Sequence, residues 1–129
     1  MSSTFLPPIL AIDYGRRRMG LAVSRAGLAE PLEILANDQA LLPRLRAICR
    51  QENIAQIVVG VSEGPSATEA NRFREQLAKE LKLPVTGVDE TLSTNQARRK
   101  LRQAGRRLRH VDHLAAAEFL QDWMDGQGR

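Results

Sequence analysis

The chain has 129 residues, of which 43% are hydrophobic and 26% are charged, a composition typical of one ordinary globular domain. No segment approaches the ~20 consecutive apolar residues of a membrane-spanning helix, and the first residues lack the pattern of a signal peptide. The single cysteine, Cys49, cannot form an intrachain disulfide, which favours a reducing compartment. We therefore expect one cytoplasmic domain, residues 1–129, that makes no contact with a membrane.

Basic residues exceed acidic ones by 19 to 15, and their distribution is uneven. One cluster consists of Arg16, Arg17 and Arg18, and a second, denser cluster lies in residues 98–109. The guanidinium fork matches phosphate oxygens, so the clusters favour nucleic acid as a partner, although a solvated basic face is the simpler alternative. Five aromatic residues are too few for a base-stacking platform.

The first part of the chain predicts three consecutive strands. After an extended lead-in, residues 1–8, the apolar run 9–12 is typical of a strand buried on both faces, and it stops at Asp13. Residues 20–24 form a second strand that makes a hairpin with the first. A third strand lies within residues 28–35, where Pro31 predicts an irregular or edge position.

Helices and strands then alternate. From about residue 38, apolar residues recur at helical spacing, and residues 57–61 form a buried strand. Ser66 and Glu69 form a capping box that opens a helix to about residue 82. Residues 84–88 form the last strand, a second capping box at 93–96 opens a short helix, and a final helix covers 111–124 before a frayed tail, 125–129.

This order predicts an α/β fold with a mixed five-stranded sheet flanked by helices. Three consecutive strands favour antiparallel pairing, whereas the later strand–helix units require parallel strands with right-handed crossovers. The chain shows no internal repeat, low-complexity tract or linker. We therefore expect a single domain.

Acidic residues follow two of the buried strands and open the last helix. Asp13 follows the first strand, Asp89 and Glu90 follow the last, and Asp112 begins the final helix. Parallel strands gather ligands beyond their carboxyl ends, so these acids can meet at one edge. Carboxylates brought together repel one another unless cations lie between them, and Mg²⁺ or Mn²⁺ suits oxygen ligands. Two such ions ~4 Å apart are typical of phosphoryl-transfer enzymes, so the pattern predicts a nuclease.

Each acid also has a structural alternative. Asp13 can simply begin a turn, and Asp112 can act only as a helix N-cap. Asp89 and Glu90 alternate in direction, so only one of them is expected to face the metals. His110 and His113 are interpreted as phosphate contacts or solvated side chains, because no further Cys or His completes a zinc site.

Four segments together resemble one family across almost the whole chain. They are residues 13–24 (DYGRRRMGLAVS), 57–60 (IVVG), 83–94 (LPVTGVDETLST) and 111–121 (VDHLAAAEFLQ). They resemble the YqgF/RuvX family, which implies a ribonuclease H-like fold related to the RuvC junction resolvases. The family is described both as nucleases of the pre-16S rRNA 5′ end and as Holliday junction resolvases. The resemblance implies Asp13, Glu90 and Asp112 as the catalytic, metal-binding acids, with Asp89 as a further ligand candidate.

Two positions depart from the family pattern. Thr91 stands where the family usually has arginine, which can lower activity unless a nearby arginine compensates, and Ser62 stands in a loop that is usually Gly-Leu-Pro. The residues expected to bind nucleic acid are Arg16, Arg17, Arg18, Thr91, Ser93, Thr94, Arg98, Arg99, Arg102, Arg106, Arg107 and Arg109.

The leading hypothesis is therefore a nuclease that uses two Mg²⁺ or Mn²⁺ ions and hydrolyses structured nucleic acid. The first candidate substrate is the 5′ end of pre-16S rRNA. Alternatives are a Holliday junction resolvase and a non-catalytic nucleic-acid-binding factor in ribosome assembly. A nucleotide-binding fold of the actin or sugar-kinase type would need two such domains. The choice of RNA or DNA, and of a monomer or a C2 homodimer, stays open.

Overall fold

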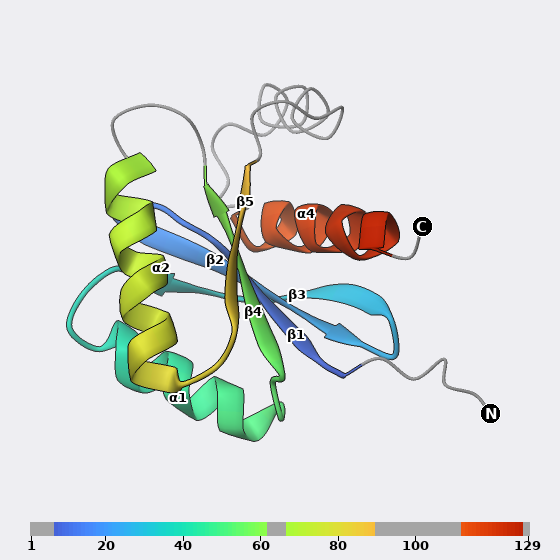
Figure 1. The fold of residues 1–129 in the computed structure, drawn as a ribbon, viewed down its shortest axis with the longest axis horizontal. Coiled ribbons are helices and arrows are strands. Elements are labelled where there is room, and N and C mark those ends of the chain that lie inside the picture. The colour runs from blue at the N-terminus through green and yellow to red at the C-terminus, as the bar shows by residue number, and fades with distance from the viewer. Residues whose placement is uncertain (1–6, 62–66, 90–111, 128–129) are drawn as a thin grey trace.

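The fold is a five-stranded mixed sheet with helices on both faces (Figure 1), and the computed structural model describes residues 7–61, 67–89 and 112–127 of it. The elements in chain order are β1 (Ile9–Asp13), β2 (Arg18–Arg25), β3 (Leu28–Ala36), α1 (Leu41–Gln51), β4 (Gln56–Val61), α2 (Ala67–Leu81), β5 (Val85–Asp89) and α4 (Asp112–Gln127). The strand order is β3-β2-β1-β4-β5. The first three strands are antiparallel, and β1, β4 and β5 are parallel, which confirms the predicted sheet. The short helix predicted after residue 93 lies outside the described residues.

The two faces of the sheet bury separate apolar clusters, because side chains alternate along each strand. On β1, Leu10 and Ile12 face α1 and α2, where they pack with Leu45 and Leu77. Ile9 and Ala11 face α4. The cluster under α4 consists of Ile9, Ala11, Ala22, Val58, Ala116, Phe119, Leu120 and Met124. The central strands are therefore buried on both sides, as their continuous apolar runs predict.

The strand that contains Pro31 lies at the edge of the sheet, as predicted. The pairing of β2 with β3 passes from Leu21 opposite Glu33 to Ala22 opposite Pro31, so one extra residue of β3 bulges out. Proline has no backbone N–H to donate, and an edge strand with a bulge accommodates that loss.

The helix α4 crosses the second face of the sheet and is fixed at the hairpin turn between β2 and β3. The Gln121 Oε1 atom accepts a hydrogen bond of 2.9 Å from the backbone N–H of Ala29. Asp112 lies nine residues before Gln121 in the helix, about 13 Å from it at 1.5 Å per residue. The helix therefore begins well away from the turn between β2 and β3. In Figure 1, α4 accordingly begins near β4 and β5 and runs to the right, above β3 in the view.

Two boundaries differ from the sequence prediction. The last helix continues to Gln127, so the tail expected to fray from residue 125 is helical for three more residues. Helix α1 begins at Leu41 rather than near residue 38, because the Asp38 side chain accepts a hydrogen bond from the Ala40 N–H and forms a turn there. In the described part of the chain, no helix has both the length and the apolar character needed to span a membrane.

Candidate functional site

The carboxyl ends of the three parallel strands meet at one edge of the sheet. Asp13 is the last residue of β1 and pairs with Gly60 of β4, which in turn pairs with Val88 of β5. Only β4 separates β1 from β5, so Asp13 and Val88 lie two strand spacings apart, or about 10 Å. Asp89 ends β5, and Glu90 follows it outside the described residues. The sequence prediction that β1 and the last strand end at the same edge is confirmed.

Asp13 lies between two glycines at the carboxyl end of β1. It shares the α4 face with Ile9 and Ala11, because it is two residues beyond Ala11 on the same strand. Its partners on the two neighbouring strands are Gly20 of β2 and Gly60 of β4, both buried. In-register partners lie side by side in the sheet, so residues without a side chain flank the half-buried carboxylate on both neighbouring strands. A carboxylate is the kind of oxygen ligand that a hard divalent cation such as Mg²⁺ prefers.

The other predicted catalytic acids are only partly within the described structure. Asp112 is the first residue of α4 and Asp89 the last of β5, but their side chains lie outside the described set, as does all of Glu90. Within the described residues, no three His, Cys, Asp or Glu side chains come together as a metal site. Convergence of the three acids therefore stays a prediction.

The other residues singled out in the sequence for nucleic-acid binding also lie partly within and partly outside the described residues. Those within the described ranges are Arg16, Arg17 and Arg18, all exposed. Those outside are Ser62, Thr91, Ser93, Thr94, Arg98, Arg99, Arg102, Arg106, Arg107, Arg109 and His110.

His113 is more enclosed than the sequence suggests. It lies in the first turn of α4 and is half-buried, and its Nδ1 atom is buried with no hydrogen-bond partner in the structure as described. A buried ring nitrogen is not solvated, which corrects the simple solvent-exposed alternative. The sequence signal that could have indicated this is the apolar stretch that follows, Leu114 to Ala117, which places the start of the helix against the sheet.

Arg16 is held by an acidic residue of α2. Its Nε donates a 2.8 Å hydrogen bond to Glu69 Oε1, and the two side chains are 60% and 45% exposed. Exposed pairs of this kind contribute at most about 1 kcal/mol. Glu69 therefore contacts the β1–β2 hairpin. The predicted capping box with Ser66 stays a prediction, because Ser66 lies outside the described residues.

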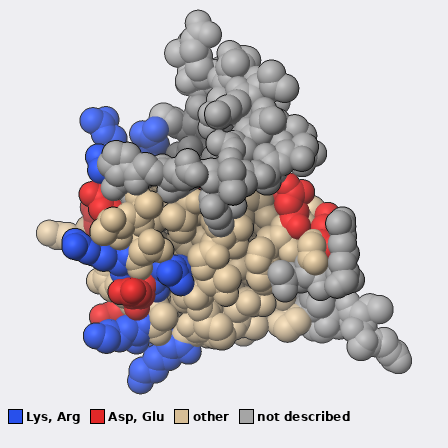
Figure 2. Space-filling model, turned by 45° about the horizontal axis from the view of Figure 1, so that its top comes forward, with Lys and Arg blue, Asp and Glu red and all other residues tan. Residues whose placement is uncertain are grey.

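The described charges are unevenly distributed over the surface. Figure 2 shows Lys and Arg side chains, with acidic ones among them, on the side that carries α1 and α2. Helix α4 has no Lys or Arg, and it contains Asp112, Glu118, Asp122 and Asp125. Electrostatic attraction of a polyanion therefore favours the α1–α2 side and the β1–β2 hairpin over the outer surface of α4.

Gly15 sets the shape of the hairpin that carries the three arginines. A Cβ atom at this position would collide with the backbone carbonyl oxygen of Arg18, so only glycine fits without a shift of the chain. We expect Gly15→Ala to destabilise the protein by about 1–3 kcal/mol, the usual cost of overpacking, as measured by urea unfolding. Gly126→Ala is the control, because nothing lies within 4 Å of a Cβ there and alanine favours a helix by up to about 1 kcal/mol. Equal stability of the two variants would contradict the prediction.

Comparison with solved structures supports the fold. The structure of Thermus thermophilus RuvC in complex with a Holliday junction superposes with a TM-score of 0.62 and 17% identity, over 93% of this chain and 94% of that one. At this identity the likeness shows the fold alone, and it defines the chain as a ribonuclease H-like domain.

The family is shown by sequence. The family model RuvX, described as Holliday junction resolvase, matches residues 8–126, so the chain belongs to the RuvX family. A relative from Anaeromyxobacter sp. (strain Fw109-5) is 40% identical over 92% of this chain and 96% of its own length. A relative from Geobacillus kaustophilus (strain HTA426) is 38% identical over 92% of this chain and 97% of its own length. Both relatives carry the name "Putative pre-16S rRNA nuclease".

Proposed function

We propose that this protein is a divalent-metal-dependent endonuclease that hydrolyses phosphodiester bonds at the 5′ end of pre-16S rRNA. Membership of the RuvX family, over residues 8–126, is the observation that carries the proposal. The names of the relatives from Anaeromyxobacter and Geobacillus support rRNA as the substrate. The glycine-flanked carboxylate at the end of β1 supports metal-dependent chemistry at this edge.

In this proposal Asp13, Glu90 and Asp112 hold Mg²⁺ or Mn²⁺. Two bound ions would neutralise the charge that develops on the phosphate during hydrolysis. Asp13 is suited to this role because it ends a buried strand whose backbone is hydrogen-bonded on both sides, which fixes its direction. The exposed Arg17 and its neighbours on the hairpin would contact the phosphate backbone near the reacting bond.

A second candidate function is the resolution of four-way DNA junctions. The description of the matching family favours it, and such a reaction needs two symmetric cuts, which a C2 homodimer supplies. A monomer is sufficient for processing of a single RNA end. The two functions therefore differ both in substrate and in the mass of the active species.

Cleavage of matched substrates distinguishes these functions. The purified protein is incubated with a labelled pre-16S rRNA 5′ segment and with a four-way DNA junction, each with Mn²⁺, Mg²⁺ or EDTA. We expect metal-dependent cleavage of the RNA, and preferred cutting of the junction by a dimer would instead select the resolvase function. Binding that persists in EDTA, with no cleavage of either substrate in any metal, would overturn both and leave a non-catalytic binding factor.

The Arg16–Glu69 pair predicts a competition between protein and substrate. A phosphate that contacts Arg16 must displace the Glu69 carboxylate or share the guanidinium with it. We expect Glu69→Gln to tighten nucleic-acid binding by a few-fold, since exposed ion pairs are worth at most about 1 kcal/mol. Glu75→Gln, an exposed acid on the same helix, is the matched control, and fluorescence anisotropy at fixed salt is the measurement. Equal affinities of the two variants would contradict the prediction.

A further inference from the structure

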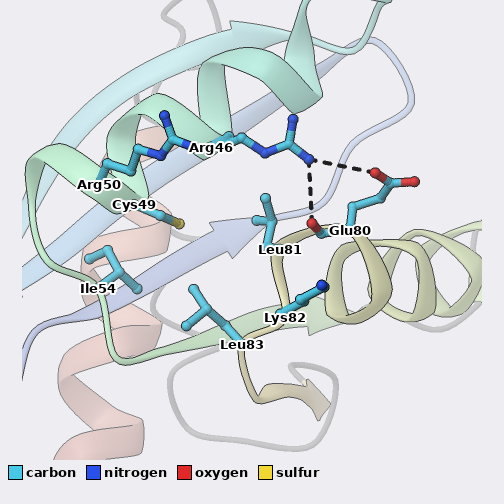
Figure 3. A pocket seen from close by; sticks show the side chains of 8 residues that line it. All are labelled: Arg46, Cys49, Arg50, Ile54, Glu80, Leu81, Lys82 and Leu83. Atoms are coloured by element: carbon cyan, nitrogen blue, oxygen red, sulfur yellow. Dashed lines mark hydrogen bonds and ion pairs between the residues drawn. The ribbon is translucent and has the colours of Figure 1, made fainter.

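A second candidate site lies at the amino ends of the parallel strands, whereas Asp13 lies at their carboxyl ends. Between α1 and the end of α2 the structure has an open cavity of about 330 Å³ (Figure 3). Its lining residues are Arg46, Cys49, Arg50, Ile54, Glu80, Leu81, Lys82 and Leu83. Ile54 and Leu83 precede β4 and β5, respectively, so the cavity lies where these strands begin. A strand of six residues separates the two edges by roughly 17 Å, so the cavity is distinct from the candidate catalytic edge.

The cavity combines an apolar floor with a cationic rim. The floor consists of Ile54, Leu81, Leu83 and the thiol of Cys49, and Figure 3 shows the sulfur directed toward the other floor residues. The rim carries three cations, two of which, Arg46 and Arg50, lie four residues apart on the same face of α1. The third, Lys82, follows α2 with a positive φ of 57°.

One of the three cations is already engaged, and two are not. Arg46 donates a 3.3 Å hydrogen bond to the backbone oxygen of Glu80 and lies 3.6 Å from its carboxylate, so it also stabilises the end of α2. Neither Arg50 nor Lys82 has an ion pair or side-chain hydrogen bond within the described residues. Three cations and one carboxylate leave the rim with a formal charge of +2.

We propose that this cavity binds a phosphomonoester whose compact body has one flat face that can lie on the apolar floor, such as a 5′-nucleotide. A phosphomonoester carries a charge of about −1.5 to −2 at neutral pH, which matches the rim, whereas a single carboxylate would leave excess positive charge. Arginine and lysine contact phosphate oxygens directly. The floor accommodates the face of a base, and the volume is at the small end of the range for ligand sites, about 300–1,000 Å³. The nucleotide can be free or the 5′-phosphorylated end of a strand.

The cysteine in the floor provides a local measure of occupancy. Cys49 is the single cysteine of the chain, so a maleimide labels one position only. Burial raises the pKa of its thiol, so labelling is slow at neutral pH and becomes slower when a ligand covers the sulfur. The labelling rate is followed by intact mass in buffer without divalent cations, which keeps this test independent of cleavage.

The probes are 5′-AMP, adenosine, inorganic phosphate and a 5′-phosphorylated oligonucleotide. We expect 5′-AMP to slow the labelling of Cys49 in a saturable way, and adenosine or phosphate alone to act only at much higher concentration. Protection by the oligonucleotide but not by 5′-AMP would also support the site and would assign its ligand to a strand end. Unchanged labelling with both phosphorylated probes would overturn the proposal.

Variants of the rim locate the binding. We expect Arg50→Ala and Lys82→Ala each to weaken binding of the protecting probe about tenfold, the loss typical of one hydrogen bond to a charged group. Glu80→Gln should tighten binding by removing the one negative charge of the rim. Lys79→Ala, an exposed lysine in the last turn of α2 that does not line the cavity, is the matched control and should leave binding unchanged. Equal losses in Lys79→Ala and the two rim variants would show non-specific attraction and overturn the proposal.

Discussion

Asp13→Asn is expected to reduce metal-dependent cleavage by about 100-fold or more, because mutation of groups that merely support metal ligands already costs 10–100-fold. This corresponds to about 2.7 kcal/mol of lost transition-state stabilisation. Asparagine has the shape of aspartate but lacks its negative charge, so the glycine-flanked position keeps its packing while the attraction for a cation falls. The measurement is the initial rate of cleavage of the preferred substrate at saturating Mn²⁺.

Asp38→Asn is the control for this substitution. Asp38 is exposed, and its side chain accepts a hydrogen bond from the Ala40 N–H, which asparagine can also accept. We expect the control to retain full activity and both variants to unfold at the same urea concentration as the unmodified protein. Cleavage by Asp13→Asn at the unmodified rate would contradict the role of Asp13 and, with it, the proposed metal site.

Phe119→Ala is expected to lower the free energy of unfolding by about 3–5 kcal/mol, the usual cost of removing a buried aromatic side chain. Phe119 is 2% exposed in the cluster between α4 and the sheet. A domain of this size is stable by about 5–15 kcal/mol, so the variant is expected to lose a large share of its stability. Urea unfolding monitored by circular dichroism measures the change.

Leu28→Ala is the matched control for the core substitution. Leu28 is 63% exposed, and changes at such positions usually stay within about 0.5 kcal/mol. A loss of stability in Phe119→Ala no larger than in Leu28→Ala would show that α4 is not packed on the sheet as described. Because α4 begins at Asp112, that result would also count against the predicted convergence of Asp112 with Asp13.

The two ends of the parallel strands have different chemistry. At the carboxyl ends, Asp13 lies between two glycines and is suited to a cation. At the amino ends, the cavity between α1 and α2 presents cations above an apolar floor and is suited to an anion. If both proposals hold, one domain contacts phosphate at opposite ends and on opposite faces of the sheet, at least about 17 Å apart.

The sequence by itself determined the described elements and their order. The apolar run at residues 9–12 predicts a strand buried on both faces because it has no polar side that could face water, and the structure confirms it. The sequence also limits the possible strand pairings, because a strand–helix–strand unit requires its two strands to be parallel. Pro31 identified an edge strand because it lacks a backbone donor.

Only the tertiary structure decided which residues lie beside one another across the sheet and between helices. The two glycines that flank Asp13 are seven and 47 residues away in the chain, and no local periodicity relates them to it. The Arg16–Glu69 pair and the cavity between α1 and α2 likewise join segments that meet only after the sheet has formed. The physical reason is that periodicity reports which face of an element is buried, whereas lateral register and side-chain pairing depend on distant residues that the fold brings together.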